Sequence, residues 1–167
     1  MTDSTFYLGR LFDPKTARLT STDINYDSAD LTTHAVVTGM TGSGKTGLCI
    51  DLLEEAALQG VPAIIVDPKG DLTNLFLHFP EMRSTDFEPW INPDLAKGEG
   101  KSIAELASIT AEDWKNGLQE WDINTEDILK LKNSVERAIY TPGSSLGIPV
   151  NILTSFKQPD LSWEENE

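Results

Sequence analysis

The sequence predicts an α/β protein in which helices flank a mostly parallel β-sheet. Three consecutive features carry this prediction. The apolar run HAVVT, residues 34–38, suits a buried strand and leads into a glycine-rich loop. Residues 45–59 then show helical periodicity, and VPAIIVD, residues 61–67, is typical of a second buried strand. Strand, loop, helix and strand follow one another within about thirty residues, the size of one βαβ unit.

The residues before this unit predict a short N-terminal β segment. It begins with the apolar FYLGRLF, turns at Asp13 and Pro14, and ends in the polar SADLTT. We therefore expect an N-terminal β-rich segment at 1–33, a core at 34–156 and a tail at 157–167.

The stretch after the second strand is expected to begin with a short helix over residues 72–79, which stops before Pro80. Residues 82–100 contain Pro89, Pro93 and two late glycines, a composition that predicts irregular chain.

Two longer helices are predicted next. Ser102 and Glu105 form a capping box at the start of the first, and Thr125 is the expected cap of the second. Trp114 and Trp121 are seven residues apart on one helical face, so we predict that they pack in the core rather than stack on nucleic-acid bases.

The chain then returns to strand-like sequence. AIYT, residues 138–141, predicts a third strand, a turn follows at Pro142–Gly143, and IPVNIL, residues 148–153, predicts a fourth strand. The helices between the second and third strands would form an insertion in the core at about 80–137.

The charge balance limits the partners of the chain. The 13 basic and 27 acidic residues give a formal charge of −14, and the basic residues are not gathered in one stretch. Such a surface repels nucleic acid and anionic membranes, so we expect weak DNA binding and no membrane partner. A single cysteine, no signal-peptide pattern and no apolar run of roughly 18 to 20 residues favour a cytoplasmic location.

The loop after the first strand has the pattern Gly-x-x-x-x-Gly-Lys-Thr, completed by Gly39, Gly44, Lys45 and Thr46. Small residues let main-chain N–H groups approach phosphate oxygens, and the following helix adds its positive end. Lys45 would neutralise the outer phosphates, and the Thr46 hydroxyl is the expected Mg²⁺ ligand.

The predicted cofactors are therefore ATP and Mg²⁺. Lys45 and Asp67 are the candidate catalytic residues, and Thr46 and Asp67 are the candidate metal ligands. The candidate phosphate-binding residues share the glycine loop and the first helical turn: Gly39, Thr41, Gly42, Ser43, Gly44, Lys45, Thr46 and Gly47.

Asp67 ends the aliphatic run AIIVD and admits three interpretations. It could be the Walker B aspartate that holds Mg²⁺, or it could close the strand beside the glycine-loop strand while the Walker B acid lies elsewhere. It could also be a turn former, together with Asp71, around Pro68 and Gly70.

With these residues in view, the chain resembles the HerA/FtsK superfamily of P-loop ATPases, and is similar to large bacterial HerA-like, helicase-type ATP-binding proteins. The stretches that carry the resemblance are LTTHAVVTGMTGSGKTGLCIDLLEEA and VPAIIVDPKGDL, and the likeness runs from about residue 6 to residue 156. The resemblance implies a RecA-like, three-layer P-loop NTPase core, hexameric rings and movement of DNA. It places Asp67 and Asp71 near the γ-phosphate.

The resemblance also implies that the core is incomplete. The Walker B strand, polar sensor and arginine finger of the superfamily lie further along than this sequence extends. We therefore expect an N-terminal piece of a longer protein that hydrolyses little ATP by itself. Self-association would follow the family, and DNA would be engaged only through the full-length protein.

Two other functions remain open on the sequence. One is a self-sufficient small P-loop kinase or GTPase that uses Asp67 as its Walker B acid, although the guanine-reading Asn-Lys-x-Asp motif is missing. The other is a non-catalytic nucleotide-binding assembly module. All three hypotheses require Lys45 for nucleotide binding.

Overall fold

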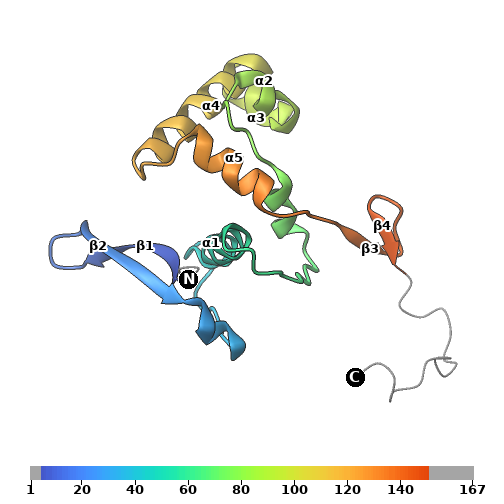
Figure 1. The fold of residues 1–167 in the computed structure, drawn as a ribbon. Coiled ribbons are helices and arrows are strands. Elements are labelled where there is room, and N and C mark those ends of the chain that lie inside the picture. Colours follow the sequence, from blue (N-terminus) through green and yellow to red (C-terminus); the bar gives the residue numbers. More distant parts are fainter. Residues whose placement is uncertain (1–4, 151–167) are drawn as a thin grey trace, which may run out of the picture. The chain divides into compact units, whose positions relative to one another are not determined.

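The computed structural model describes residues 5–150 (Figure 1). The chain divides into two compact units, the first ending at Val135 and the second beginning at Glu136. The described residues form a mixed α/β structure with two separate two-stranded sheets.

The first unit begins with a β-hairpin, in agreement with the predicted N-terminal β segment. Strand β1 (Thr5–Asp13) pairs antiparallel with β2 (Arg18–Asp27). The Asp13 carboxylate closes the turn by accepting the N–H of Lys15 at 2.8 Å and the hydroxyl of Thr16 at 2.9 Å. A short 3₁₀ helix, η1 (Ser28–Thr32), follows the hairpin.

Helix α1 (Lys45–Leu58) confirms the predicted helix after the glycine loop. Gln59 is its C-cap, and Gly60 follows with a φ of 71°, the left-handed conformation that glycine adopts most readily. The Val61 N–H returns to the carbonyl of Ala56 at 2.8 Å and satisfies one of the last carbonyls of the helix.

The hairpin packs on α1 through one buried ring and two hydrogen bonds. Phe6 of β1 is fully buried. The backbone N–H of Tyr7 donates to the Glu55 carboxylate at 3.1 Å, and the Gln59 amide donates to the carbonyl of Thr5 at 3.3 Å. Because β1 lies at an edge of its sheet, the side chains of Glu55 in α1 and of its C-cap Gln59 can bind the backbone of this strand.

The rest of the first unit is helical (Figure 1). Asn124 caps the last of these helices, one residue before the Thr125 that the sequence analysis proposed, while the Ser102–Glu105 capping box is confirmed. The stretch 82–100, predicted to be irregular, contains short helices instead. The elements are η2 (Asp71–Phe76), α2 (Ser84–Phe87), η3 (Glu88–Trp90), α3 (Pro93–Gly98), α4 (Ile103–Gln119) and α5 (Thr125–Ser134).

The helical core is small because α2 is short. Phe87 of α2 packs against Ala107 and Ala111 of α4, and its ring centroid lies 4.8 Å from that of Phe79. Four residues of α2 rise about 6 Å, whereas the 17 residues of α4 rise about 25 Å, so α2 covers only the N-terminal half of α4.

The prediction that Trp114 and Trp121 pack in the core is therefore wrong. They lie on the C-terminal half of α4 and remain 57% and 38% exposed. The heptad spacing put both rings on one face of the helix, but within residues 5–150 the short helix α2 does not extend over them, and the Arg10 side chain of β1 contacts the Trp121 ring without burying it.

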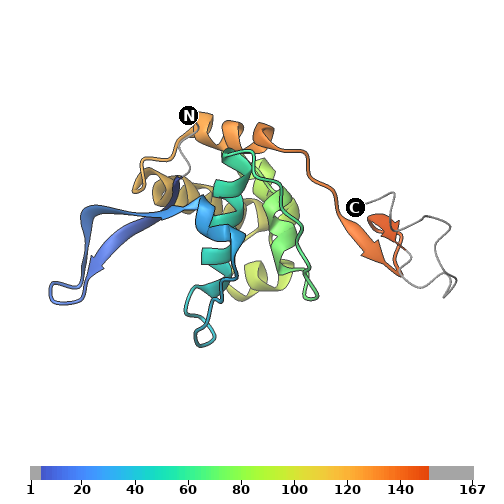
Figure 2. The same ribbon diagram turned by 60° about the horizontal axis from the view of Figure 1, so that its bottom comes forward.

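The predicted strands at 34–38 and 61–67 are also absent. Neither segment forms β-sheet hydrogen bonds with another strand, and both are drawn as coil (Figure 2). Their apolar side chains face solvent: Val36 is 83% exposed, Ile64 97% and Val66 86%. A parallel strand needs neighbours that bind its N–H and C=O groups, and no segment within residues 5–150 pairs with either run.

The second unit contains a short parallel pair. Strand β3 (Tyr140–Pro142) pairs with β4 (Ile148–Val150), which partly confirms the third and fourth predicted strands. The remainder of the predicted fourth strand, 151–153, and the predicted tail, 157–167, lie outside the described residues. In the part of the chain that the structure describes, no helix has the length and apolar character needed to cross a bilayer.

Asp51 lies one turn before Glu55 on the face of α1 near the hairpin. Desolvation by burial, and then repulsion from Glu55, raise the pKa of Asp51 above its usual 3.8. The folded chain therefore binds this proton more tightly than the unfolded chain, and the charge on Asp51 destabilises the fold above the raised pKa.

We predict that Asp51→Asn raises the melting temperature at pH 7, by on the order of 1 to 3 °C because the group is only partly buried. The gain should shrink as the pH falls through the raised pKa toward 3.8, where Asp51 itself becomes protonated. Thermal melts monitored by circular dichroism across this pH range, with the exposed Glu112→Gln as control, measure the effect. A gain that is independent of pH would contradict this explanation.

Candidate phosphate-binding site

The glycine loop before α1 is bent by left-handed backbone. Gly42 and Gly44 have φ values of 80° and 87°, and the N–H of Ser43 donates to the carbonyl of Met40 at 3.2 Å. A side chain on Gly39 would collide with the Ser43 hydroxyl. The loop therefore requires small residues at the positions where the sequence pattern has glycine.

The loop delivers the chain directly into an open helix end. Gly44 is the N-cap of α1, and the first helical hydrogen bond runs from the N–H of Leu48 to the carbonyl of Gly44 at 3.0 Å. The N–H groups of Lys45, Thr46 and Gly47 precede that bond and have no carbonyl partner within the helix. No side chain caps them, and the first turn carries no acidic residue. The positive end of α1 is thus available to an anion.

Lys45 folds back across the loop. Its Nζ donates to the carbonyl of Met40 at 2.6 Å, and the side chain remains partly exposed. The partner is a neutral carbonyl, so the positive charge stays uncompensated by any carboxylate within residues 5–150. The role of Met40 has no signal in the sequence, because a backbone carbonyl accepts a hydrogen bond whatever its side chain is.

Thr46 occupies the second position of α1, and it is exposed at the open helix end. Its hydroxyl is an oxygen ligand of the kind that Mg²⁺ prefers. The described residues contain no group of three or more His, Cys, Asp or Glu side chains able to hold a metal. A magnesium ion here would thus be bound by Thr46, phosphate oxygens and water, which is the common arrangement for Mg²⁺.

Asp67 is engaged in its own turn. Its two carboxylate oxygens accept the N–H of Gly70 at 2.9 Å and the N–H of Leu72 at 2.8 Å, and so hold the start of η2. The Leu72 N–H, followed by those of Gly70, Lys69 and Asp71, lowers the pKa of Asp67 against the opposing effect of desolvation. This geometry matches the turn-former interpretation, while the catalytic and metal roles of Asp67 stay predictions.

The structure thus brings the candidate residues 39–47 together in one loop and helix end. No hydrogen bond described within residues 5–150 joins Asp67 to that loop.

Comparison with known proteins points to a particular family. The family described as Helicase HerA, central domain, matches residues 6–144. The Type 4 coupling protein DotL of Legionella pneumophila subsp. pneumophila (strain Philadelphia 1) is 43% identical over 54 residues, which cover 32% of this chain. The match covers only 7% of the length of DotL. No solved structure matches the chain significantly.

We predict opposite effects for two neighbouring glycines. Gly44→Ala should destabilise the chain by about 1 to 2 kcal/mol, because a Cβ is unfavourable at left-handed φ. Gly47 lies inside α1 with free space around it, so Gly47→Ala should leave stability unchanged or raise it by up to about 1 kcal/mol. Urea unfolding of both variants measures the difference, and equal stabilities would contradict the loop conformation.

Proposed function

The chain belongs to the family of the HerA helicase central domain, and on that premise we propose that residues 39–47 bind the phosphates of Mg-ATP in a HerA/FtsK-like motor ATPase. The observation that carries the proposal is the left-handed glycine loop that opens onto the uncapped N-terminus of α1. It combines converging N–H donors, a helix end and one mobile cation at a single place.

Each part of the loop has a role in this proposal. The N–H groups of the first turn of α1 donate to phosphate oxygens. Lys45 exchanges the Met40 carbonyl for the β- and γ-phosphates, where a charge-assisted hydrogen bond replaces a weaker one. Bound Mg²⁺ would neutralise phosphate charge, and the hydroxyl of Thr46 would orient it.

We propose that the isolated chain binds ATP far better than it hydrolyses it. Hydrolysis needs a residue that positions the attacking water and further charge stabilisation. Asp67 holds the N–H groups of Gly70 and Leu72, so it would have to leave its turn to serve the metal or the water. Tight binding with negligible turnover would also fit the non-catalytic module that the sequence left open.

Hexamer assembly and DNA movement are proposals that come from the family alone. The chain spans about 7% of the length of DotL, so the activity of the whole relative does not transfer to this segment. We propose that the chain engages DNA only as part of a HerA/FtsK-like motor assembly, which the family would form as a hexamer. The net charge of −14 supports the same assignment, because this segment repels DNA.

We predict that Lys45→Ala weakens ATP binding by roughly 10- to 150-fold, since a hydrogen bond to a charged group contributes about 1.5 to 3 kcal/mol. Isothermal titration calorimetry measures the affinities of the wild type and the variant for Mg-ATP and for Mg-ADP. Lys15→Ala, an exposed lysine in the hairpin turn, is the matched control and should bind as the wild type does. Unchanged affinity in Lys45→Ala would refute the proposed site.

We also predict that Thr46→Ala reduces the dependence of ATP affinity on Mg²⁺ while leaving metal-free binding nearly intact. Titrations with ATP in excess Mg²⁺ and in excess EDTA measure the affinity for ATP with and without the metal. Thr73→Ala, whose hydroxyl caps the Gly70 carbonyl in another turn, serves as control. Retention of the full Mg²⁺ effect in Thr46→Ala would remove this residue from the metal site.

A further inference from the structure

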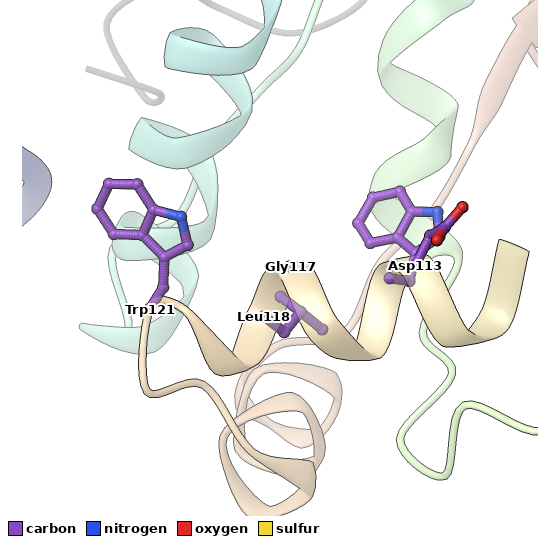
Figure 3. A pocket seen from close by; sticks show the side chains of 5 residues that line it. Asp113, Gly117, Leu118 and Trp121 are labelled. Carbon is purple, nitrogen blue, oxygen red and sulfur yellow. The ribbon is translucent and has the colours of Figure 1, made fainter.

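The C-terminal half of α4 carries a shallow groove that the phosphate-binding site does not use. We call it the α4 groove; its volume is about 380 Å³. Figure 3 shows Asp113 and Trp121 projecting from the same side of the helix, with Gly117 and Leu118 between them. All of the lining residues come from this helix and its end: Asp113, Trp114, Gly117, Leu118 and Trp121.

The α4 groove exposes more aromatic surface than a helix normally leaves in water. Trp114 is more than half exposed, and Gly117 adds no side chain that would shield the rings. Tryptophan is mostly buried in folded proteins, and contiguous exposed aromatic surface marks interaction sites.

One end of the groove already binds a guanidinium group from within the chain. The guanidinium carbon of Arg10 lies 5.2 Å from the ring centroid of Trp121, and its Nη2 lies 3.6 Å from the Asp122 carboxylate. The ring face and the carboxylate thus act together on a single cation.

Asp122 is placed for this contact by an unusual backbone. It has a φ of 59°, which closes the end of α4 together with the bond from the Ile123 N–H to the Leu118 carbonyl at 3.0 Å.

The other end of the groove also has an indole ring next to a carboxylate, here within the regular helix and without a cation among the described residues. Trp114 and Asp113 are adjacent and line the same cavity. Within residues 5–150, no Lys or Arg lies over the Trp114 ring and no ion pair holds Asp113.

The charge around the α4 groove selects a cationic occupant. Asp113 lines the groove, Asp122 follows at its end, and Lys115 is the one basic residue of α4. The whole chain carries −14, so nucleic-acid phosphates are repelled although the exposed rings could stack on bases. Arginine fits better than lysine because its planar guanidinium stacks on an aromatic ring while it pairs with a carboxylate.

We propose that the α4 groove binds an arginine side chain from a basic segment of a protein partner. The guanidinium stacks on Trp114 and pairs with Asp113, as Arg10 does with Trp121 and Asp122 at the other end. This docking surface is independent of ATP binding.

A fluorescein-labelled arginine–serine peptide titrated with the 167-residue chain tests the proposal by fluorescence anisotropy. We expect saturable binding that weakens as salt is added. The same peptide with lysine in place of arginine should bind several-fold more weakly. Trp114→Ala should weaken binding of the arginine peptide about tenfold, and Asp113→Asn should weaken it in the same direction.

Matched variants separate the groove from general effects. Trp90→Ala removes a ring of similar exposure outside the groove, and Glu112→Gln removes a neighbouring charge that does not line it. Both should bind within about twofold of the wild type. Circular dichroism melts establish whether each variant is folded. If Trp114→Ala is unfolded, the Asp113→Asn variant provides the test of the groove.

Several results would overturn the proposal. The first is that the wild type shows no saturable binding of the arginine peptide. The second is that Trp114→Ala and Asp113→Asn both bind this peptide as tightly as the wild type does. The third is that the wild type binds the lysine peptide as tightly as the arginine peptide. Tighter binding of a thymidine oligonucleotide would show a nucleic-acid site instead. Self-association of the wild type that Trp114→Ala abolishes, without peptide binding, would assign the groove to a second copy of the chain.

Discussion

The left-handed turn at Gly44 is the constraint on which the candidate site depends. It directs the chain from the glycine loop into α1 so that the first N–H groups of the helix are left without partners and without a capping side chain. Lys45 can then reach back to Met40 across the same loop. A residue with a Cβ at this position would favour a different entry into the helix, and the donors would no longer converge.

A local positive site is compatible with the strongly acidic chain because charge acts over short distances. At physiological salt the Debye length is about 8 Å, so an anion at the end of α1 senses mainly Lys45 and the helix end. The acidic exterior acts instead on large partners. A surface of this charge disfavours the long phosphate backbone of DNA and attracts basic segments, and this contrast distinguishes the candidate phosphate-binding loop from the α4 groove.

Features set by neighbouring residues were predictable from the sequence. The hairpin, α1 with Gly60 just beyond its C-cap, and the Ser102–Glu105 capping box each depend on local signals and are present. The segments 34–38 and 61–67 were predicted as strands from their apolar side chains, but a strand exists only with a hydrogen-bonding neighbour. The prediction that Trp114 is buried was wrong for a similar reason, since periodicity identifies a helix face but not the length of the element that packs on it.

For the candidate site, the sequence pattern located the loop at residues 39–47. The hydrogen bond accepted by the Met40 carbonyl and the turn contacts of Asp67 could not be predicted, because they depend on the folded backbone rather than on residue type.

Backbone amide chemical shifts recorded with and without Mg-ATP report most directly on whether the loop donors bind phosphate. If they do, the amide signals of residues 42–47 should move together and saturate with one affinity, while those of the α4 residues around Trp114 stay in place. Saturating nucleotide that leaves the 42–47 amides unmoved, with the chain folded, would contradict the assignment of this loop as the phosphate site.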